Sequence, residues 1–175
     1  MPKKLTSVVM SINYLKIKTW FKDNKYFVAI MLLAIVLLLY NVSARSFWGD
    51  EKAVLEYLNN RMGGFLAAYW QLPDNHPPLY YFLVLVASKL LPWTELTIRL
   101  VSILAGLGTV WLVYTFTFRV THNKKTALLA MFFTAFSSYF VLISQMARYH
   151  SLAGFSSLLV FYFFYRLFVE GYNKR

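Results

Sequence analysis

The sequence predicts an all-α, polytopic membrane protein. Of its 175 residues, 59% are hydrophobic and only 14% are charged, and the mean hydropathy is +0.50. Soluble domains average roughly 45–50% apolar and about 25% charged residues, and a soluble fold of this length has too little interior to bury so much apolar surface. Four apolar segments are also long enough to cross a membrane as helices, which need roughly 17–25 residues. We therefore expect about four transmembrane helices and an external loop that carries juxtamembrane helices.

Residues 1–25 are predicted to form a basic segment at the cytoplasmic face of the membrane. Apolar residues recur there at helical spacing, which suits a helix lying on the inner leaflet. Six lysines precede the first apolar run: Lys3, Lys4, Lys16, Lys18, Lys22 and Lys25.

The first transmembrane helix is predicted over residues 26–43, where the apolar run extends from Tyr26 to Val42. Val42-Ser43-Ala44 resembles the small-residue cleavage site of a signal peptide. We expect an uncleaved anchor instead, because the preceding polar region is about 25 residues long and the apolar run is long for a signal peptide.

Residues 44–97 are predicted to form an external loop, and they contain five of the seven acidic residues in the chain. Asp50 can cap a helix from Glu51 to about Met62, which Gly63-Gly64 would end. Val54, Leu58 and Met62 share one face of that helix, so we expect it to lie flat against the membrane.

The same loop contains a short apolar stretch, residues 79–91, between Pro77-Pro78 and Pro92. At about 1.5 Å per residue it would cover only about 20 Å, which is too short for a comfortable span. We therefore predict a re-entrant or interfacial helix there.

Residues 98–175 are predicted to contain three further transmembrane helices, over Ile98–Phe118, Ala127–Met146 and Ser151–Val169. With four spans, the basic N-terminus, the Arg119–Lys125 loop and Lys174-Arg175 all lie in the cytoplasm, as the positive-inside rule requires. If residues 79–91 also crossed, the Arg119–Lys125 loop would lie outside. The charge pattern therefore favours four spans.

Composition also argues against several functions. The net charge is +11, but most cations flank apolar runs and no nucleic-acid recognition module accompanies them, so we expect no nucleic-acid partner. The chain has no cysteine, which excludes disulfides and thiolate metal sites. It also has no phosphate-cradling glycine loop and no zinc-ligand spacing, which disfavours an ATPase or a nucleotide-sugar enzyme.

Polar residues that could carry chemistry cluster in the predicted external segments. The first candidates are Asp50 and Glu51, because a carboxylate at the exit of a membrane helix can act as a general base toward a hydroxyl acceptor. The alternative is a helix cap with acids near the positive end of the helix dipole.

The other candidates are three short motifs. His76 precedes a rigid Pro-Pro turn and could bind a phosphate or a sugar, although an incidental histidine is the alternative. Arg99 lies four residues after Glu95, which predicts a structural ion pair. Arg148 and Tyr149 follow the third predicted span, and an external arginine there could bind a lipid phosphate or extend to ordinary headgroups.

Four motifs in order resemble one enzyme family: Asp50-Glu51 after the first span, His76-Pro-Pro-Leu-Tyr-Tyr81, Glu95-x-x-x-Arg99-Leu-x-Ser102, and Ala147-Arg148-Tyr149. The order resembles the N-terminal part of GT-C membrane glycosyltransferases. It is most similar to the dolichyl-phosphate-mannose–protein mannosyltransferase-like family (glycosyltransferase family 39), with bacterial relatives such as the aminoarabinose transferases and the RgtA/B/C/D-like enzymes. The resemblance covers roughly residues 25–169.

The resemblance implies an inverting transfer of a sugar from a polyprenyl-phosphate-linked donor to a hydroxyl on a lipid, glycan or protein, at the outer face of the cell (inner or plasma) membrane. It implies that Asp50 is the catalytic base beside Glu51. It assigns donor or substrate binding to His76, Arg148, Tyr149 and Arg99. Some relatives carry a second acid shortly after the arginine, but residues 151–154 here are Ser-Leu-Ala-Gly. No metal ligand is assigned, and a divalent cation is the candidate cofactor.

Members of this family are usually several times longer, so the resemblance implies an N-terminal part, with a C-terminal chain as a candidate partner beside membrane lipids. The alternative from another class is a non-catalytic membrane module or truncated pseudoenzyme that acts as a partner subunit. A small transporter subunit is disfavoured because its functional charges would lie near the middle of the membrane, whereas the arginines here lie near the ends of the predicted spans.

Overall fold

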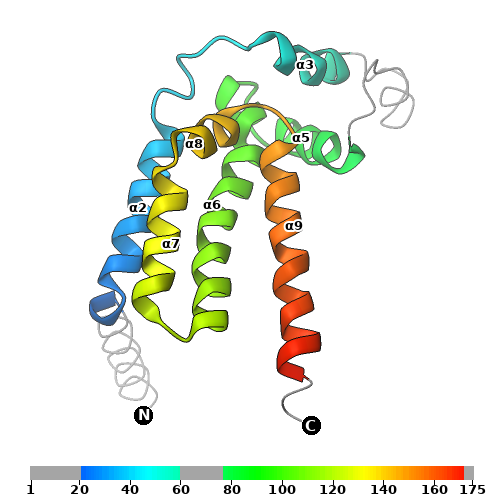
Figure 1. Ribbon diagram of the computed structural model, residues 1–175. Coiled ribbons are helices and arrows are strands. Elements are labelled where there is room, and N and C mark those ends of the chain that lie inside the picture. The colour runs from blue at the N-terminus through cyan, green and yellow to red at the C-terminus, as the bar shows by residue number, and fades with distance from the viewer. Residues whose placement is uncertain (1–20, 60–76, 172–175) are drawn as a thin grey trace, which may run out of the picture.

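The computed structural model describes residues 21–59 and 77–171, within which every regular element is a helix. Four helices run along a common bundle axis, and three short helices gather at one end of that bundle (Figure 1). The long helices are α2 (Lys25–Leu39), α6 (Glu95–Thr121), α7 (Lys124–Phe136) and α9 (His150–Phe164), which continues as the π-helical turn η3 (Tyr165–Glu170). The short helices are α3 (Lys52–Asn59), α5 (Pro78–Leu90) and α8 (Ser138–Gln145).

Local capping explains the sharp turn between α6 and α7. His122 ends α6 in the left-handed conformation, with φ of 52°. The side chain of Asn123 then accepts the backbone N–H of Lys125 at 2.9 Å, so α7 begins at once. This arrangement satisfies N–H groups that the first turn of a helix leaves without intrahelical partners. The turn places its lysines at the end of the bundle opposite the short helices (Figure 1).

Helix α6 is the centre of the bundle and packs against α2, α5, α7, α8 and α9. Half of its most apolar 18-residue window is buried, whereas none of the corresponding window of α9 and η3 is. Gly106 lies where three helices meet: a Cβ atom there would be 2.8 Å from Cβ of Ser144 on α8 and 3.3 Å from Leu38 on α2. The absence of a side chain at Gly106 therefore allows α8 to approach α6.

We expect Gly106→Ala to destabilise the protein by about 1–3 kcal/mol, because the new methyl group overpacks the α6–α8 contact. Gly154→Ala is the matched control, since a Cβ on this α9 glycine meets nothing within 4 Å and alanine has the higher helix propensity. Thermal unfolding in detergent checks both variants. Equal melting temperatures for them would show that the close contact at Gly106 does not matter.

The length of the helices supports fewer spans than the sequence predicts. Two helices are long and apolar enough to cross a membrane, Glu95–Thr121 and His150–Glu170, and a third span results if α7 and α8 count as one. The predicted span Ala127–Met146 is bent by 60° at this junction, because Ser137 both ends α7 and caps α8. Helix α2 has 15 residues, fewer than the roughly 17 expected of a span. The four-span count is therefore not confirmed.

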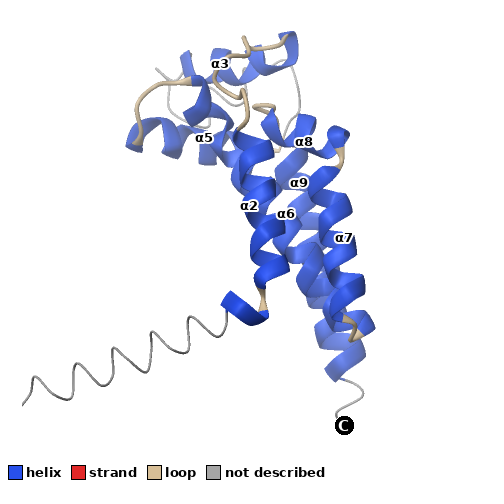
Figure 2. Ribbon diagram, turned by 90° about the vertical axis from the view of Figure 1, so that its left-hand side faces the viewer, coloured by secondary structure: helices blue, strands red, loops and turns tan. Residues whose placement is uncertain are grey.

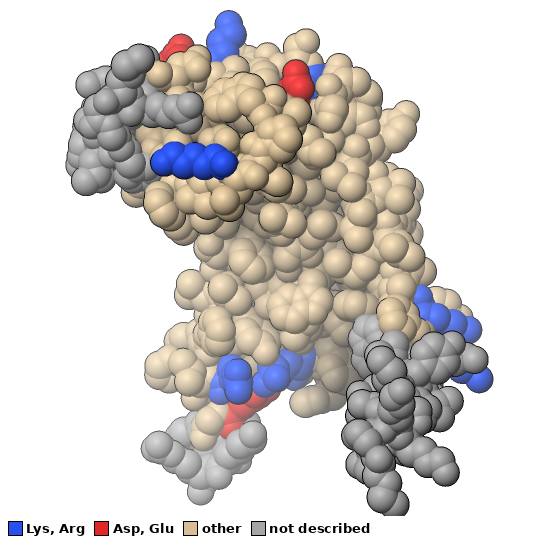
Figure 3. Space-filling model, turned by 180° about the vertical axis from the view of Figure 1, so that it is seen from behind, with Lys and Arg blue, Asp and Glu red and all other residues tan. Residues whose placement is uncertain are grey.

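Charged side chains mark the two ends of the bundle. Figure 3 shows a wide band without Lys, Arg, Asp or Glu on one face, with charges above and below it. One end holds the start of α2, the α6–α7 turn and η3; the other holds α3, α5, α8 and the start of α6, and Figure 2 gives the same arrangement from the side. The segment that contains Asp50 and Glu51 lies at the opposite end of the bundle from the Arg119–Lys125 turn. Of the predicted basic segment, residues 1–20 lie outside the described residues.

Candidate functional site

The first polar cluster forms where the chain leaves α2 and turns into the 3₁₀ helix η1 (Gly49–Glu51). Successive side chains on a 3₁₀ helix point about 120° apart, so the two neighbouring acids face different surroundings. Asp50 is exposed to solvent, whereas Glu51 is only 1% exposed. The sequence treats Asp50 and Glu51 as a pair, but the fold separates an accessible carboxylate from a buried one.

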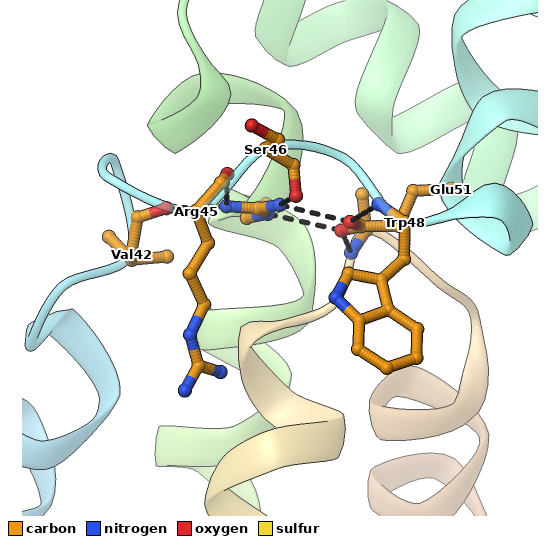
Figure 4. Close-up of polar contacts among 7 residues, drawn as sticks. Val42, Arg45, Ser46, Trp48 and Glu51 are labelled. Atoms are coloured by element: carbon orange, nitrogen blue, oxygen red, sulfur yellow. Dashed lines mark hydrogen bonds and ion pairs between the residues drawn. The ribbon is translucent and has the colours of Figure 1, made fainter.

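Glu51 forms a bidentate ion pair with Arg99, which α6 contributes from its buried face (Figure 4). Arg99 donates from Nε to Oε1 at 3.0 Å and from a terminal nitrogen to Oε2 at 2.9 Å. Glu51 also accepts the backbone N–H groups of Ala147, at 2.6 Å, and Trp48, at 2.9 Å. One carboxylate thus joins the loop after α2, the start of α6 and the segment that precedes α9.

The remaining N–H groups of Arg99 bind the loop that surrounds it. They donate to the carbonyl oxygens of Val42, Arg45 and Ser46, and the distance to Arg45 is 3.0 Å. The predicted Glu95–Arg99 pair is therefore wrong. Glu95 lies in the exposed first turn of α6, where water solvates it, whereas the buried guanidinium needs a partner that is equally desolvated.

The surroundings of Glu51 control its ionisation. Burial by itself raises the pKa of this carboxyl, but the hydrogen bond from Arg99, those from the backbone of Ala147 and Trp48, and the charge of Arg99 outweigh it. The pKa of Glu51 therefore lies below its ordinary value of 4.5. The group is ionised at neutral pH and holds the loop as an anion.

This lowered pKa predicts a stability change in acid. A carboxyl whose pKa is lower in the folded state stabilises the fold above its unfolded pKa, here 4.5, and loses that contribution as the pH falls through the folded value. We expect the melting temperatures of the wild type and Glu51→Gln to differ most at neutral pH and to converge below 4.5. Thermal scans in detergent across that range test this. A difference that does not change with pH would contradict it.

Arg148 holds the backbone of Asp50, the other acid of the cluster. Its guanidinium donates to the backbone carbonyl of Asp50 at 2.7 Å, and its own carbonyl accepts from Ser102 Oγ at 2.9 Å. The hydroxyl of Tyr80 lies 3.0 Å from the same Ser102 oxygen. Ser102 closes one of the family motifs in the sequence without an assigned role, and in the structure its hydroxyl links α5 and α6 to the Arg148 segment.

The remaining predicted binding residues are Tyr149 and His76. Tyr149 is half-buried against the apolar cluster between α3 and α5, and its ring centroid lies 4.4 Å from that of His150. His76 lies outside the described residues. Its role therefore stays a prediction.

Helix α3 packs on protein, where the sequence predicts packing on the membrane. Its buried residues Val54, Tyr57 and Leu58 form one cluster with Tyr81 and Val84 of α5. Burial raises the pKa of the Tyr57 phenol to about 12, so this hydroxyl is not a base near neutral pH. Over the described part of the predicted helix Glu51–Met62, the chain forms η1 followed by α3, and Asp50 lies within η1 instead of capping the helix. Residues 60–62 and the predicted stop at Gly63-Gly64 lie outside the described residues.

Gln145, which was not predicted as a functional residue, fixes the backbone where the chain leaves α2. Its amide nitrogen donates to the carbonyl oxygens of Leu37, at 2.9 Å, and Tyr40, at 3.0 Å. These carbonyls lie at the helix C-terminus, where intrahelical partners are lacking. Gln145 is the one amide side chain in the largely apolar segment 127–146, and this is the signal that could identify it, because a buried amide needs partners.

Among residues 21–59 and 77–171, no group of three or more His, Cys, Asp or Glu side chains is placed to hold a metal ion. The divalent cation considered from the resemblance therefore stays a prediction. Within the described part of the chain, the polar cluster comprises two acids and two arginines: Asp50, Glu51, Arg99 and Arg148.

Comparison with known proteins places this cluster in a family. Residues 75–174, more than half of the chain, match the sequence profile described as dolichyl-phosphate-mannose-protein mannosyltransferase. The chain belongs to this mannosyltransferase family. Membership, together with the apolar helices, makes it an integral membrane protein of the GT-C glycosyltransferase type.

The chain is also similar to an uncharacterized protein of Aquifex aeolicus (strain VF5), with 27% identity over 151 residues. That alignment covers 83% of this chain but only 30% of the relative, so the chain spans less than a third of that relative's length. No solved structure matches the chain. The match to the family profile begins after Asp50 and Glu51, so the roles of these two acids rest on their geometry and on the resemblance of their motif.

Proposed function

We propose that the chain is a membrane glycosyltransferase, or the N-terminal part of one, that transfers a sugar from a polyprenyl-phosphate-linked donor to an acceptor hydroxyl. The observation that carries this proposal is an exposed carboxylate on a backbone segment that hydrogen bonds hold in place. Asp50 is accessible, while Glu51 and Arg148 hold the main chain on either side of it. Membership of the mannosyltransferase family supports the class of reaction.

In the proposed reaction, Asp50 accepts the proton of the acceptor hydroxyl as its oxygen attacks the anomeric carbon of the donor. A new glycosidic bond forms while the bond from that carbon to the phosphate oxygen breaks. The bonding pair leaves with the phosphate, and the product is polyprenyl phosphate. Attack from the face opposite the phosphate inverts the anomeric configuration.

Glu51 and Arg99 act as positioning residues in this proposal, because their charged atoms bind each other and the backbone of residues 42–51. Arg148 also positions this backbone, because its guanidinium donates to the carbonyl oxygen of Asp50. Fixing a reacting group in this way removes part of the entropic cost of the transition state. His76 and Tyr149 are left as the proposed contacts to the donor or acceptor.

We propose that the end of the bundle that contains Asp50, Glu51 and the short helices faces the outside of the cell membrane. The cations at the other end support this orientation, since Lys25, Arg119, Lys124 and Lys125 lie there and basic residues favour the cytoplasmic side.

Reconstitution of the chain in phosphatidylcholine nanodiscs tests the proposed function. Polyprenyl-phosphate sugars with a radiolabelled hexose or pentose are offered with and without hydroxyl acceptors. We expect saturable donor binding and release of labelled sugar from the phosphate. A chain that neither binds nor consumes any of these donors would overturn the proposal and favour a non-catalytic membrane module.

A further inference from the structure

Two adjoining cavities form a groove along α8. The smaller has a volume of about 130 Å³ and reaches the Glu51–Arg99 pair and Trp48. The larger, about 540 Å³, extends along α8 toward Phe136 and Tyr139 at the bend between α7 and α8. Three residues line both cavities: Arg45, Leu142 and Gln145. We call the combined cavity the α8 groove.

The larger part of the α8 groove is suited to a hydrocarbon chain. Its lining includes the aliphatic side chains of Leu37, Val141 and Leu142 and the aromatic side chains of Phe136 and Tyr139. Leu142, Phe136 and Tyr139 are 44%, 61% and 72% exposed, so these apolar side chains lack cover from the described protein. An open apolar groove of several hundred Å³ has the size of a ligand site.

Arg45 gives this apolar groove a positive charge. Its backbone is fixed, because Arg99 donates to its carbonyl oxygen at 3.0 Å. Its side chain is exposed and points away from the Glu51–Arg99 pair, toward the same side as the indole of Trp48 (Figure 4). Arg45 therefore stands where the two cavities meet, with its guanidinium directed away from the buried network.

The charges that line the groove do not cancel. Glu51 and Arg99 neutralise each other in a buried ion pair, and the third charged group among the described lining residues is Arg45. The groove thus combines one uncompensated cation with an apolar channel. This is the chemistry of an amphiphile with an anionic head, and a guanidinium matches the oxygens of a phosphate group.

We propose that Arg45 binds the phosphate of the lipid-linked substrate, while the polyprenyl chain lies in the α8 groove. This inference rests on the proposed function and adds a residue that the motif resemblance does not assign. Arg45 and Asp50 belong to the same loop, whose backbone Arg99 and Glu51 fix. The loop therefore fixes the backbone of the proposed phosphate-binding residue relative to the backbone of the proposed base. As the bond to the sugar breaks, the phosphate gains negative charge, which Arg45 offsets.

The test compares two ligands that differ only in the phosphate, polyprenyl phosphate and the uncharged polyprenol, with the whole chain in phosphatidylcholine nanodiscs. For Arg45→Gln we expect the affinity for polyprenyl phosphate to fall about 10- to 100-fold, as for a charge-assisted hydrogen bond, and the affinity for polyprenol to stay unchanged. Arg45→Lys should recover part of the loss. Lys89→Gln removes another exposed cation, on α5 outside the groove, and should change neither affinity.

The channel is tested separately by filling it. Leu142→Trp should lower the affinity for both ligands. Leu129→Trp, at an exposed position of α7 outside the groove, should lower neither affinity. A melting temperature equal to the wild type shows that each variant is folded.

The outcomes separate this inference from the proposed function. If polyprenyl phosphate binds but Arg45→Gln binds it as tightly as the wild type, the inference is overturned and the proposed function stands. If an excess of phosphatidylglycerol displaces polyprenyl phosphate in proportion to its concentration, the groove is a general site for anionic lipids and the inference also fails. If neither polyprenyl phosphate nor any donor binds, both proposals fail.

Discussion

Replacement of Asp50 by asparagine is expected to lower sugar transfer by about 100- to 10,000-fold, the contribution of a positioned general base. The amide has nearly the same shape but cannot accept the proton of the acceptor hydroxyl. The backbone carbonyl of Asp50, to which Arg148 donates, is unchanged by the substitution. We therefore expect membrane insertion and the melting temperature to stay close to the wild type.

Glu56→Gln is the matched control for this experiment. Glu56 is an exposed acid on the neighbouring helix α3, and its loss should leave the rate of transfer unchanged. The measurement is release of labelled sugar from the polyprenyl-phosphate donor, in the active form of the protein. An Asp50→Asn variant that keeps the wild-type rate would remove Asp50 from the reaction and leave the exposed acid without a catalytic role.

The helices were predictable from sequence where hydrophobicity alone decides them. The apolar segment at residues 98–118 lies within α6, and the segment at 151–169 lies within α9 and η3. Hydropathy could not reveal the bend at Ser137, because a capping hydroxyl changes the direction of a helix without changing its composition. It also could not tell whether the apolar face of α3 meets lipid or protein, since both surroundings are apolar.

The candidate site was predictable in composition but not in pairing. The sequence singles out both Glu51 and Arg99, which the structure joins in one ion pair. It assigns Arg99 to Glu95 instead, because these residues are four apart. The burial pattern of α6 favours a more distant partner. Arg99 shares a face of α6 with Ser102, Ile103 and Gly106, all of which are buried. A cation on that face needs a carboxylate from another element, and no local spacing rule identifies which one.

Breaking the buried Glu51–Arg99 pair should destabilise the fold more than breaking the more exposed Arg119–Glu170 pair. We expect Glu51→Ala to destabilise the protein by about 3–5 kcal/mol, because it leaves the guanidinium of Arg99 buried without its counter-charge. The substitution also leaves the backbone N–H groups of Trp48 and Ala147 without the carboxylate that they bind. Thermal and denaturant unfolding in detergent measure the loss.

The chain provides an internal control for that experiment at the opposite end of the bundle. Arg119 and Glu170 form an ion pair at 2.6 Å whose side chains are 32% and 25% exposed, so Glu170→Ala should cost only about 0–1 kcal/mol. A double substitution of Glu51 and Arg99 by apolar residues should cost much less than the sum of the two single changes, because no buried charge is then left. If Glu51→Ala destabilised the protein no more than Glu170→Ala, the result would contradict the claim that the Glu51–Arg99 network fixes the backbone of residues 42–51. The positioning of Asp50 and Arg45 would then need another explanation, since both depend on the backbone that this pair holds.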